Sequence, residues 1–337
     1  MVSIKDVAAK AGVAISTVSK VLNHYPNVSA ASKEKVQAAI KELNYIPNSM
    51  AAALSSKRSA RIAILINSAS SYQTGDEANM QYLSGALNCA RELSLDTITF
   101  FFSMLEERNA EEMSRYLKSQ GVGVLLVFGL SREDRAIRAL IDRNDFPAVL
   151  VDVPLSGERI SSVGIDEEVA QYDVARKTIQ EHIGKNSGDP SSLRVLYIAG
   201  NGNGYTTAER TKGIRRLSDE LGFSLSVRYG DFSEKKARGI ALVASAERDV
   251  IICASDLMAI GVLNALKELK LSRTVCGFGG LRLMAYAGNG INTVKEDFEL
   301  IARKATEEAR YMLNGEPGKR VYVPHSVTKY QYLDMIN

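Results

Sequence analysis

The sequence predicts a small all-α head followed by an α/β body of two lobes, each built on a parallel β-sheet. The 337 residues exceed one small domain and suit a small module plus a larger body. Near the N-terminus, apolar residues recur at helical spacing, break once and resume. From Arg61 onward, short apolar runs of strand length alternate with helical segments through two halves of the chain. Such βαβ alternation requires parallel sheets covered by helices on both faces.

The first two helices are short and joined by a turn. Gly12 ends the first, and Ala14 or Ser16 can cap the second. Their inner faces are apolar and consist of Ile4, Val7 and Ala8, then Val18, Val21 and Leu22. The outer side of the second helix carries groups that suit base edges and phosphates in a major groove, namely Ile15, Ser16, Ser19 and Lys20. The segment predicts a DNA-reading helix-turn-helix; an ordinary helical hairpin with a polar outer face is the alternative.

A third helix is expected over about residues 30–43, after a polar segment that contains Pro26. Its apolar positions stand at helical spacing and close a three-helix core: Val36, Ala39, Ile40 and Leu43. A core of this size is marginal alone and is helped by attachment to a larger body.

Charge is distributed unevenly along the chain. Residues 1–58 hold eight basic and three acidic residues, a net charge of +5. The rest of the chain holds 34 basic and 36 acidic residues, a net charge of −2, which together give the total of +3. A basic head on a nearly neutral body is expected for a protein whose partner is a phosphate backbone.

Composition excludes several other classes. Hydrophobic residues make up 45% and charged residues 24%, which is ordinary for a globular protein. No apolar run approaches the roughly 20 residues that cross a bilayer, and no apolar block marks a signal sequence, so we expect a cytoplasmic protein without a membrane partner. Cysteine and histidine number three each and are widely spaced, so we expect free thiols, no metal site and no cofactor.

The body is expected to alternate strands and helices in two runs. Strands are predicted at 62–66, 97–102, 122–128, 148–153, 163–165, 194–198, 224–229, 250–253 and 274–277. Helices are predicted at about 77–94, 108–120, 132–144, 167–183, 208–221, 234–247 and 256–269. Two sheets of this kind give two lobes with a cleft between them.

The chain resembles the LacI/GalR family of bacterial repressors. The likeness is dense and ungapped over residues 3–58, where the helix-turn-helix is followed by Val28-Ser29, the third helix, Leu43-Asn44-Tyr45-Ile46-Pro47-Asn48, Ala51-Ala52-Ala53-Leu54 and Lys57-Arg58. Over residues 60–337 it is looser but continuous, and it is visible in Asp152, in 210–213, in 255–261 and in 292–298. In that family the body is like the periplasmic sugar-binding proteins.

The resemblance implies a domain plan. It places the helix-turn-helix head at residues 1–46, a hinge helix and linker at 47–59, and an effector-binding and dimerisation core at 60–337. The chain would cross between lobes near 155–161, 279–294 and 316–322. The N-lobe would then comprise about 60–158 and 294–318, with a helix at 297–314. The C-lobe would comprise 159–293 and 319–337, with a final strand at 321–330.

The resemblance also implies how the head reads DNA. A hinge helix would form on operator DNA, and Leu54 would wedge into the minor groove and kink the duplex. Segment 49–56 is rich in alanine but too short to hold a helix unaided; packing of Leu54 on the body is the alternative. The expected DNA contacts are Ile4, Lys5, Ala14, Ile15, Ser16, Thr17, Ser19, Lys20, Asn23, Ser29, Asn48, Ala51 and Leu54. Many family members have arginine at Ala52 and at Lys20, and lysine offers a point charge instead of a bidentate fork.

An effector site is expected where the strands of both lobes end, because parallel sheets present ligands there. The candidates, beside Asn67, are Ser68, Ser103, Phe128, Asp152, Tyr205, Arg210, Ser255 and Gly279. By resemblance, Arg210 would hold the effector and Asp152 would bond sugar hydroxyls; the alternatives are a first-turn helix charge and a strand-end turn residue. We expect Asp256 to cap the helix at 256–269 and Ser255 to face the ligand.

The segment Gly277-Phe278-Gly279-Gly280 departs from the family. The family usually has Gly-Tyr-Asp-Asp there, and its first aspartate binds effector hydroxyls. With Arg210 kept and this acid lost, a positive cleft is expected. The effector would then be anionic, such as a sugar phosphate or sugar acid, or at least no typical neutral monosaccharide.

Three rival functions are weaker. A dinucleotide-dependent or sugar-modifying enzyme is suggested by the loop 200–204, but the third glycine of its fingerprint would fall at Tyr205. A solute-binding protein has no use for the basic head, and an architectural DNA protein has no use for a cleft-forming body. We therefore expect a regulator that is not an enzyme: a repressor that binds a palindromic operator as a homodimer under effector control. With no heptad tail, a coiled-coil tetramer is not expected.

Overall fold

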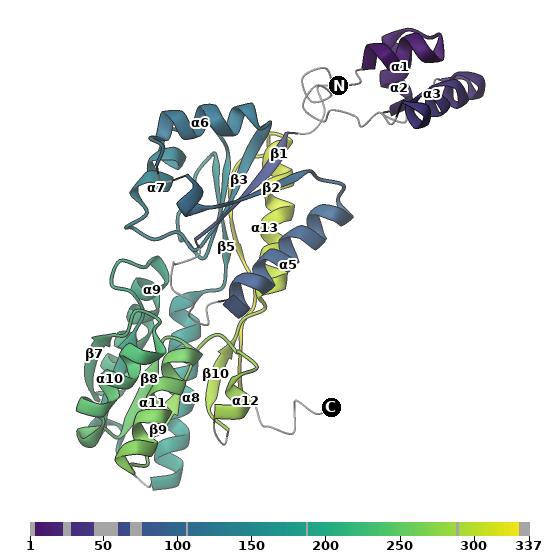
Figure 1. The fold of residues 1–337 in the computed structure, drawn as a ribbon. Coiled ribbons are helices and arrows are strands. Elements are labelled where there is room, and N and C mark those ends of the chain that lie inside the picture. The colour runs from purple at the N-terminus through teal and green to yellow at the C-terminus, as the bar shows by residue number, and fades with distance from the viewer. Residues whose placement is uncertain are drawn as a thin grey trace. The chain divides into compact units, whose positions relative to one another are not determined.

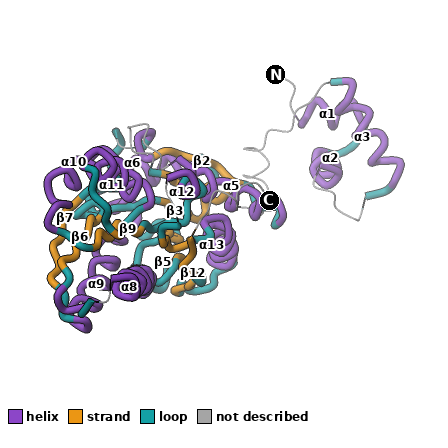
Figure 2. Tube along the Cα trace, turned by 90° about the horizontal axis from the view of Figure 1, so that it is seen from below, coloured by secondary structure: helices purple, strands orange, loops and turns teal. Residues whose placement is uncertain are grey.

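The computed structural model describes residues 4–22, 28–43, 60–67, 76–105, 107–186, 188–287 and 290–329. The chain divides into two compact units, Met1–Ser59 and Ala60–Asn337. Figures 1 and 2 show the first as a bundle of helices and the second as a body of strands covered by helices.

The head consists of α1 (Ile4–Ala11), α2 (Ile15–Leu22) and α3 (Ala30–Glu42). One buried side chain from each helix meets at the centre, and all three are 0% exposed: Val7, Val18 and Val36. Gly12 turns the chain between α1 and α2 with φ +63°, a conformation in which glycine carries no steric cost. The predicted helix-turn-helix followed by a third helix is confirmed in these residues.

The first sheet of the body has the strand order β11-β5-β4-β3-β1-β2. Every neighbouring pair is parallel. The strands are β1 (Arg61–Ile66), β2 (Thr97–Phe101), β3 (Val122–Phe128), β4 (Ala148–Val151), β5 (Ile160–Gly164) and β11 (Arg320–Tyr322). The helices on its two faces are α5 (Asp76–Glu92) and α13 (Phe298–Leu313) on one, and α6 (Ala110–Ser119) and α7 (Arg135–Asp142) on the other.

The apolar run in β1 shows why this sheet is covered on both sides. Ile62 and Ile64 lie in the core formed with α5 and α13, whereas Ala63 and Leu65 lie in the core formed with α6 and α7. All four are 0% exposed. Successive strand residues point to opposite faces, so a strand that is buried on both faces is apolar at every position.

The second sheet has the order β12-β10-β9-β8-β6-β7, and only the pairing of β10 with β12 is antiparallel. Its strands are β6 (Arg194–Ala199), β7 (Ser224–Tyr229), β8 (Val250–Cys253), β9 (Thr274–Cys276), β10 (Asn292–Lys295) and β12 (Ser326–Lys329). In Figure 2, α8 (Glu167–Asn186) and α9 (Tyr205–Leu221) lie on one side of it, with α10 (Glu234–Ala244) and α11 (Asp256–Leu269) on the other. A short helix, α12 (Met284–Ala287), and the 3-10 turns 102–104, 190–192 and 245–247 complete the described elements.

The fold class is confirmed, whereas the expected lobe boundaries fall several residues away from the observed ones. β5 pairs with β4 and β11 in the first sheet, so the first crossing follows Gly164 and not residue 158. The next crossing joins β10 to α13 at residues 296–297. The expected final strand at 321–330 is two strands, because β11 extends the first sheet and β12 pairs with β10 in the second. A short apolar run does not reveal which sheet it extends, because only the partner strand decides this.

Capping residues explain two helix starts that differ from the prediction. The α6 helix begins at Ala110 and not 108, because Asn109 and Glu112 form a reciprocal capping box. The α9 helix begins at Tyr205 and not 208, directly after Gly204 at the N-cap. Among the described residues, no helix has the length and apolar content needed to span a membrane.

Candidate functional site

The face of α2 that is turned away from the head's core carries the predicted base-reading residues. Ile15 is 45% exposed, and Ser16 and Lys20 are exposed beside it. Packing of Val18 and Val21 into the core orients this face outward. An exposed isoleucine flanked by a hydroxyl and an ammonium group can contact a thymine methyl group, base edges and phosphates.

The other predicted DNA contacts in the head vary in exposure. Lys5 and Ala14 are exposed, whereas Thr17 and Ser19 are half-buried. Ile4 packs partly into the head's core. Ser29 is exposed and its hydroxyl caps α3 by accepting from the Ser32 amide, at 3.3 Å. The remaining predicted contacts lie outside the described residues, as does the hinge helix: Asn23, Asn48, Ala51 and Leu54.

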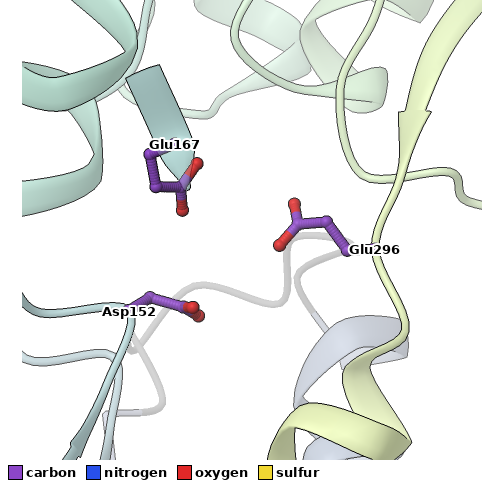
Figure 3. Close-up of side chains that lie close together, drawn as sticks. All are labelled: Asp152, Glu167 and Glu296. Atoms are coloured by element: carbon purple, nitrogen blue, oxygen red, sulfur yellow. The ribbon is translucent and has the colours of Figure 1, made fainter. Parts of the chain in front are cut away.

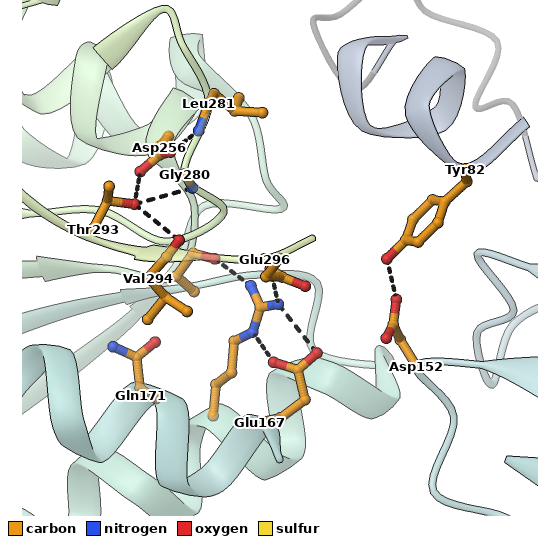
Figure 4. Close-up of polar contacts among 12 residues, drawn as sticks. Tyr82, Asp152, Glu167, Gln171, Asp256, Gly280, Leu281, Thr293, Val294 and Glu296 are labelled. Atoms are coloured by element: carbon orange, nitrogen blue, oxygen red, sulfur yellow. Dashed lines mark hydrogen bonds and ion pairs between the residues drawn. The ribbon is translucent and has the colours of Figure 1, made fainter. Parts of the chain in front are cut away.

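In the body, Arg210 donates hydrogen bonds within a buried polar cluster that includes Glu167 and Glu296, which lie near each other in Figure 4. From α9 it donates to both carboxylate oxygens of Glu167, with Nε–Oε2 at 2.6 Å and Nη2–Oε1 at 3.2 Å. Its Nη2 also donates to Glu296 at 3.3 Å, and its Nη1 donates to the Ala254 carbonyl at 2.6 Å. The guanidinium carbon stands 3.5 Å from the centre of the Phe278 ring. Each of these partners follows a strand or begins a helix at the same edge of the second sheet. Together they cover Arg210, which is only 7% exposed.

Asp152 approaches this cluster from the first sheet. It follows β4 with φ +59° and accepts a hydrogen bond from the Tyr82 hydroxyl at 2.5 Å. Its Oδ1 is buried and has no hydrogen-bond partner among the described residues. A Cβ atom added at Gly164 would lie 2.5 Å from this oxygen. Figure 3 shows the carboxylates of Asp152, Glu167 and Glu296 converging, with an oxygen of each within 4.8 Å of the others.

Glu167 and Glu296 bond the Arg210 guanidinium, whereas Asp152 bonds Tyr82. Burial, reinforced by the charge of Glu167, raises the pKa of Asp152 to about 7. Burial also raises the pKa of Glu296 well above its usual value, against the opposing effect of Arg210. The described residues therefore do not form the positive cleft that the loss of an acid at Gly279 predicted, because glutamates from two other segments pair with Arg210.

Comparison with known proteins identifies the chain. A family model described as bacterial regulatory proteins, lacI family, matches residues 3–48. The head of the chain is therefore of the lacI type. Its relatives include the HTH-type transcriptional regulator RegA of Clostridium saccharobutylicum, 29% identical over 336 residues that cover 93% of this chain and 97% of RegA. The HTH-type transcriptional regulator MalR of Staphylococcus xylosus is 27% identical over 324 residues, which cover 94% and 92%.

Solved structures match the fold of this chain. The lac repressor dimer bound to operator and the anti-inducer ONPF has a TM-score of 0.77 at 24% identity, and the match covers 97% of this chain and 98% of that one. A periplasmic solute-binding protein from Actinobacillus succinogenes with bound D-allose has a TM-score of 0.64 at 19% identity, over 82% and 99%. The body is thus periplasmic-binding-protein-like, and the resemblance stated from the sequence is confirmed. The head is thus a helix-turn-helix of the lacI type, and the relatives named above are transcriptional regulators.

The expectation that Asp256 caps α11 is wrong, because Ser255 is the capping residue. Ser255 caps α11, because its hydroxyl accepts from the Met258 amide at 3.3 Å. Asp256 is 0% exposed and accepts from the Thr293 hydroxyl at 2.6 Å and from the Leu281 amide at 2.7 Å. Burial raises the pKa of Asp256 to about 6. Either residue type can cap a helix, so the sequence alone did not distinguish them.

Gly279 is buried and lies beside β10. Its amide donates to the Val294 carbonyl at 2.9 Å, and its φ of +123° is one that side chains of other residues rarely allow. Gly280 follows with φ +71°, and a Cβ there would lie 2.7 Å from the Lys295 Cα. The pair therefore lets the backbone pass close to β10, where an aspartate at either position would be strained.

The remaining predicted effector contacts lie in different surroundings. Phe128 is 1% exposed and packs with Tyr82, their ring centres 5.2 Å apart. Ser103 is exposed on the turn after β2. Asn67 donates its amide to the Gly129 carbonyl at 3.1 Å and to the Asp134 carboxylate at 3.3 Å. Ser68 lies outside the described residues.

Tyr205 joins the two lobes. It is 6% exposed and belongs to the core of the first lobe, although α9 packs on the second sheet. The Arg132 guanidinium lies 4.5 Å from its ring centre and donates to the Gly204 carbonyl at 3.2 Å. Asn203 donates to Glu133 at 2.6 Å in the same contact. The glycine-rich loop that resembled a dinucleotide motif thus forms an interlobe contact.

Sequence reasoning missed Glu167, Glu296 and Tyr82. The two glutamates bond Arg210 from 43 and 86 positions away. Glu296 lies in the family-like segment 292–298, and Glu167 begins a predicted helix directly after a strand. Their positions near strand ends were the feature of the sequence that could have indicated a site.

Proposed function

We propose that this LacI-family regulator is a repressor that binds a palindromic operator as a homodimer and releases or tightens it in response to a polyhydroxylated effector. The observation that supports this proposal most strongly is the exposed face of α2 in a head of the lacI type. The head is joined to a two-lobed body whose fold is similar to that of a periplasmic solute-binding protein. Selection of the genomic DNA fragments that the protein binds tests this proposal.

The proposed base contacts are Ile15, Ser16 and Lys20. Phosphate and neighbouring contacts would come from Ile4, Lys5, Ala14, Thr17, Ser19, Asn23 and Ser29. Asn48, Ala51 and Leu54 would contact DNA from the hinge. Exposure of the α2 face and the net charge of +5 in residues 1–58 support this assignment.

Replacing Lys20 with alanine is expected to relax specificity at one base pair of each half-site. A lost base contact costs about 1–3 kcal/mol of discrimination, whereas a lost phosphate contact weakens all sequences alike. Competitive binding of operator variants measures the difference. Lys41→Ala on α3 is the matched control, since it removes the same charge from the head. An unchanged sequence profile would assign Lys20 to the phosphate backbone.

An apolar face on α5 is the proposed dimer contact. Met80 and Leu87, seven residues apart on one helical face, are 61% and 39% exposed, while the opposite face of α5 packs against α13. Phe101 and Met104, at the end of the edge strand β2, are 43% and 53% exposed. A second copy on this face would give the two-fold symmetry that a palindrome requires.

The double change Met80→Asp and Leu87→Asp is expected to convert the dimer into a monomer and to weaken operator binding. Buried like charges across a symmetric interface repel, and a monomer reads only one half-site. Sedimentation measures the oligomeric state. Val243→Asp is the control, because Val243 is 87% exposed on α10. A double variant that stays dimeric would place the interface elsewhere.

The effector is proposed to be uncharged and rich in hydroxyl groups, and not anionic as the lost acid suggested. The oxygens of this cluster offer acceptors for hydroxyls, above all Oδ1 of Asp152, which has no hydrogen-bond partner among the described residues. The Arg210 guanidinium that a phosphate would need is already paired with Glu167 and Glu296. In calorimetric titrations of matched neutral and phosphorylated sugars, the neutral member is expected to bind at least tenfold more tightly, a difference of about 1.4 kcal/mol. Tighter binding of the phosphorylated member would reject this effector class.

A further inference from the structure

A hollow lies at the end of the second sheet opposite to the one near Asp152, Glu167 and Glu296 (the acidic cluster). It has a volume of about 670 Å³ and opens where β9 and β10 begin, beside the last turns of α8. A smaller hollow of about 280 Å³ shares part of its lining, including His182 and Asp249. Parallel strands begin at one edge and end at the other, so this place is separate from the proposed effector site.

A buried side-chain amide in the wall of this hollow has a carbonyl oxygen that no described residue satisfies. Asn292 is 3% exposed, and its Nδ2 donates to the Thr178 hydroxyl at 3.1 Å and to Glu181 at 3.2 Å. Its Oδ1 is buried and accepts no hydrogen bond within the described part of the chain. Turning the amide over would place this oxygen against the Glu181 carboxylate, so the observed orientation is the favourable one. The wall therefore offers an acceptor that a hydroxyl donor can satisfy.

Two positive charges of the hollow have no carboxylate partner among the residues that the structure describes. Within those residues, Arg273 donates only to backbone carbonyls, those of Ser245 at 3.2 Å, Ala246 at 2.9 Å and Ser272 at 2.9 Å. Three of its five N–H groups are thereby used, and the guanidinium is held in place with two N–H groups left. Lys185 has no ion pair within the described ranges.

The other charges of the lining are paired. Lys329 bonds Glu181 at 2.5 Å and Arg194 bonds Asp249 at 3.1 Å. With His182 neutral, Arg273 and Lys185 leave the two hollows with a net charge of +2. The C-terminus of α8 opposes this with only about half a negative charge. The lining therefore favours an anion.

We propose that this hollow binds a small organic anion, a phosphate or carboxylate, that also carries a hydroxyl group. The anionic group would accept from Arg273 and Lys185, and the hydroxyl would donate to the Asn292 carbonyl oxygen. His182, whose Nδ1 is held 2.7 Å from the Thr274 hydroxyl, presents its second ring nitrogen as a further polar group. This proposal concerns a different site from the proposed function and stands independently of it.

Calorimetric titration of the full chain with glycerol 3-phosphate, inorganic phosphate and glycerol tests the ligand class. Glycerol 3-phosphate is expected to bind, inorganic phosphate to bind about tenfold more weakly because it leaves the Asn292 oxygen unbonded, and glycerol to give no heat. Equal affinity for the two phosphates would overturn the role of Asn292, and no heat with glycerol 3-phosphate would overturn the site.

Variants test the location. Lys185→Gln and Arg273→Gln are each expected to weaken glycerol 3-phosphate binding about tenfold. Lys185 is exposed, so its variant keeps the fold even if the change at Arg273 disturbs it. Lys235→Gln on α10 and Asp152→Asn in the acidic cluster are expected to leave the affinity unchanged. Binding that is indifferent to Lys185 and Arg273, or that is lost in Asp152→Asn, would overturn the proposal.

Discussion

Replacing Arg210 with methionine is expected to lower the free energy of unfolding of the body by about 3–5 kcal/mol. Removing one partner from a buried ion pair leaves an uncompensated buried charge, and that is far costlier than losing an exposed pair. Here the change would leave Glu167 and Glu296 facing Asp152 with no cation among them. Urea unfolding followed by tyrosine fluorescence measures the effect, since the chain contains no tryptophan.

The matched control is Arg216→Met in the same helix. Arg216 pairs with Glu168 at 2.8 Å, but its side chain is 47% exposed, so its loss is expected to cost at most about 1 kcal/mol. Equal and small effects of the two changes would show that the Arg210 cluster is hydrated and contributes little to stability.

The body is also expected to be more stable at pH 5 than at pH 8. The pKa of Asp152 rises from 3.8 to about 7 on folding, so the folded state binds the proton more tightly than the unfolded chain does. Stability from a raised carboxyl pKa is complete below about pH 4 and is lost as pH rises through about 7. Burial shifts the pKa of Glu296 and of Asp256 in the same direction.

Asp152→Asn is expected to remove a large part of this dependence between pH 5 and 8. The amide oxygen can still accept from the Tyr82 hydroxyl, so the hydrogen bond is kept while the titration is lost. Thermal unfolding across this range compares the two proteins. A variant that retains the full slope would assign the pH dependence to Asp256 or Glu296.

The sequence predicted the fold well because its strands are buried on both faces. Continuous apolar runs such as 122–128 and 250–253 match the observed β3 and β8 in both bounds. The sheet membership of β11 was not predictable in the same way, because it depends on pairing with β5, whose residues lie more than 150 positions away.

The candidate site was predicted in part. Asp152 and Arg210 lie together as their positions at strand ends implied, but the charge around them was misjudged. Glutamates at the start of a helix and after a strand are common surface residues, and only the folded chain brings Glu167 and Glu296 to Arg210. Tyr205, chosen as a ligand contact, is buried because Arg132 of the other lobe covers its ring.

We propose that this protein reads one palindromic DNA sequence through its head. Selection of bound genomic fragments, followed by salt-controlled titration of the recovered site and of a scrambled site, tests this proposal. We expect a recurring palindrome that is bound at least about 10³-fold more tightly than the scrambled site. Fragments without a shared palindrome, or equal affinity for both sites at the same salt concentration, would contradict it.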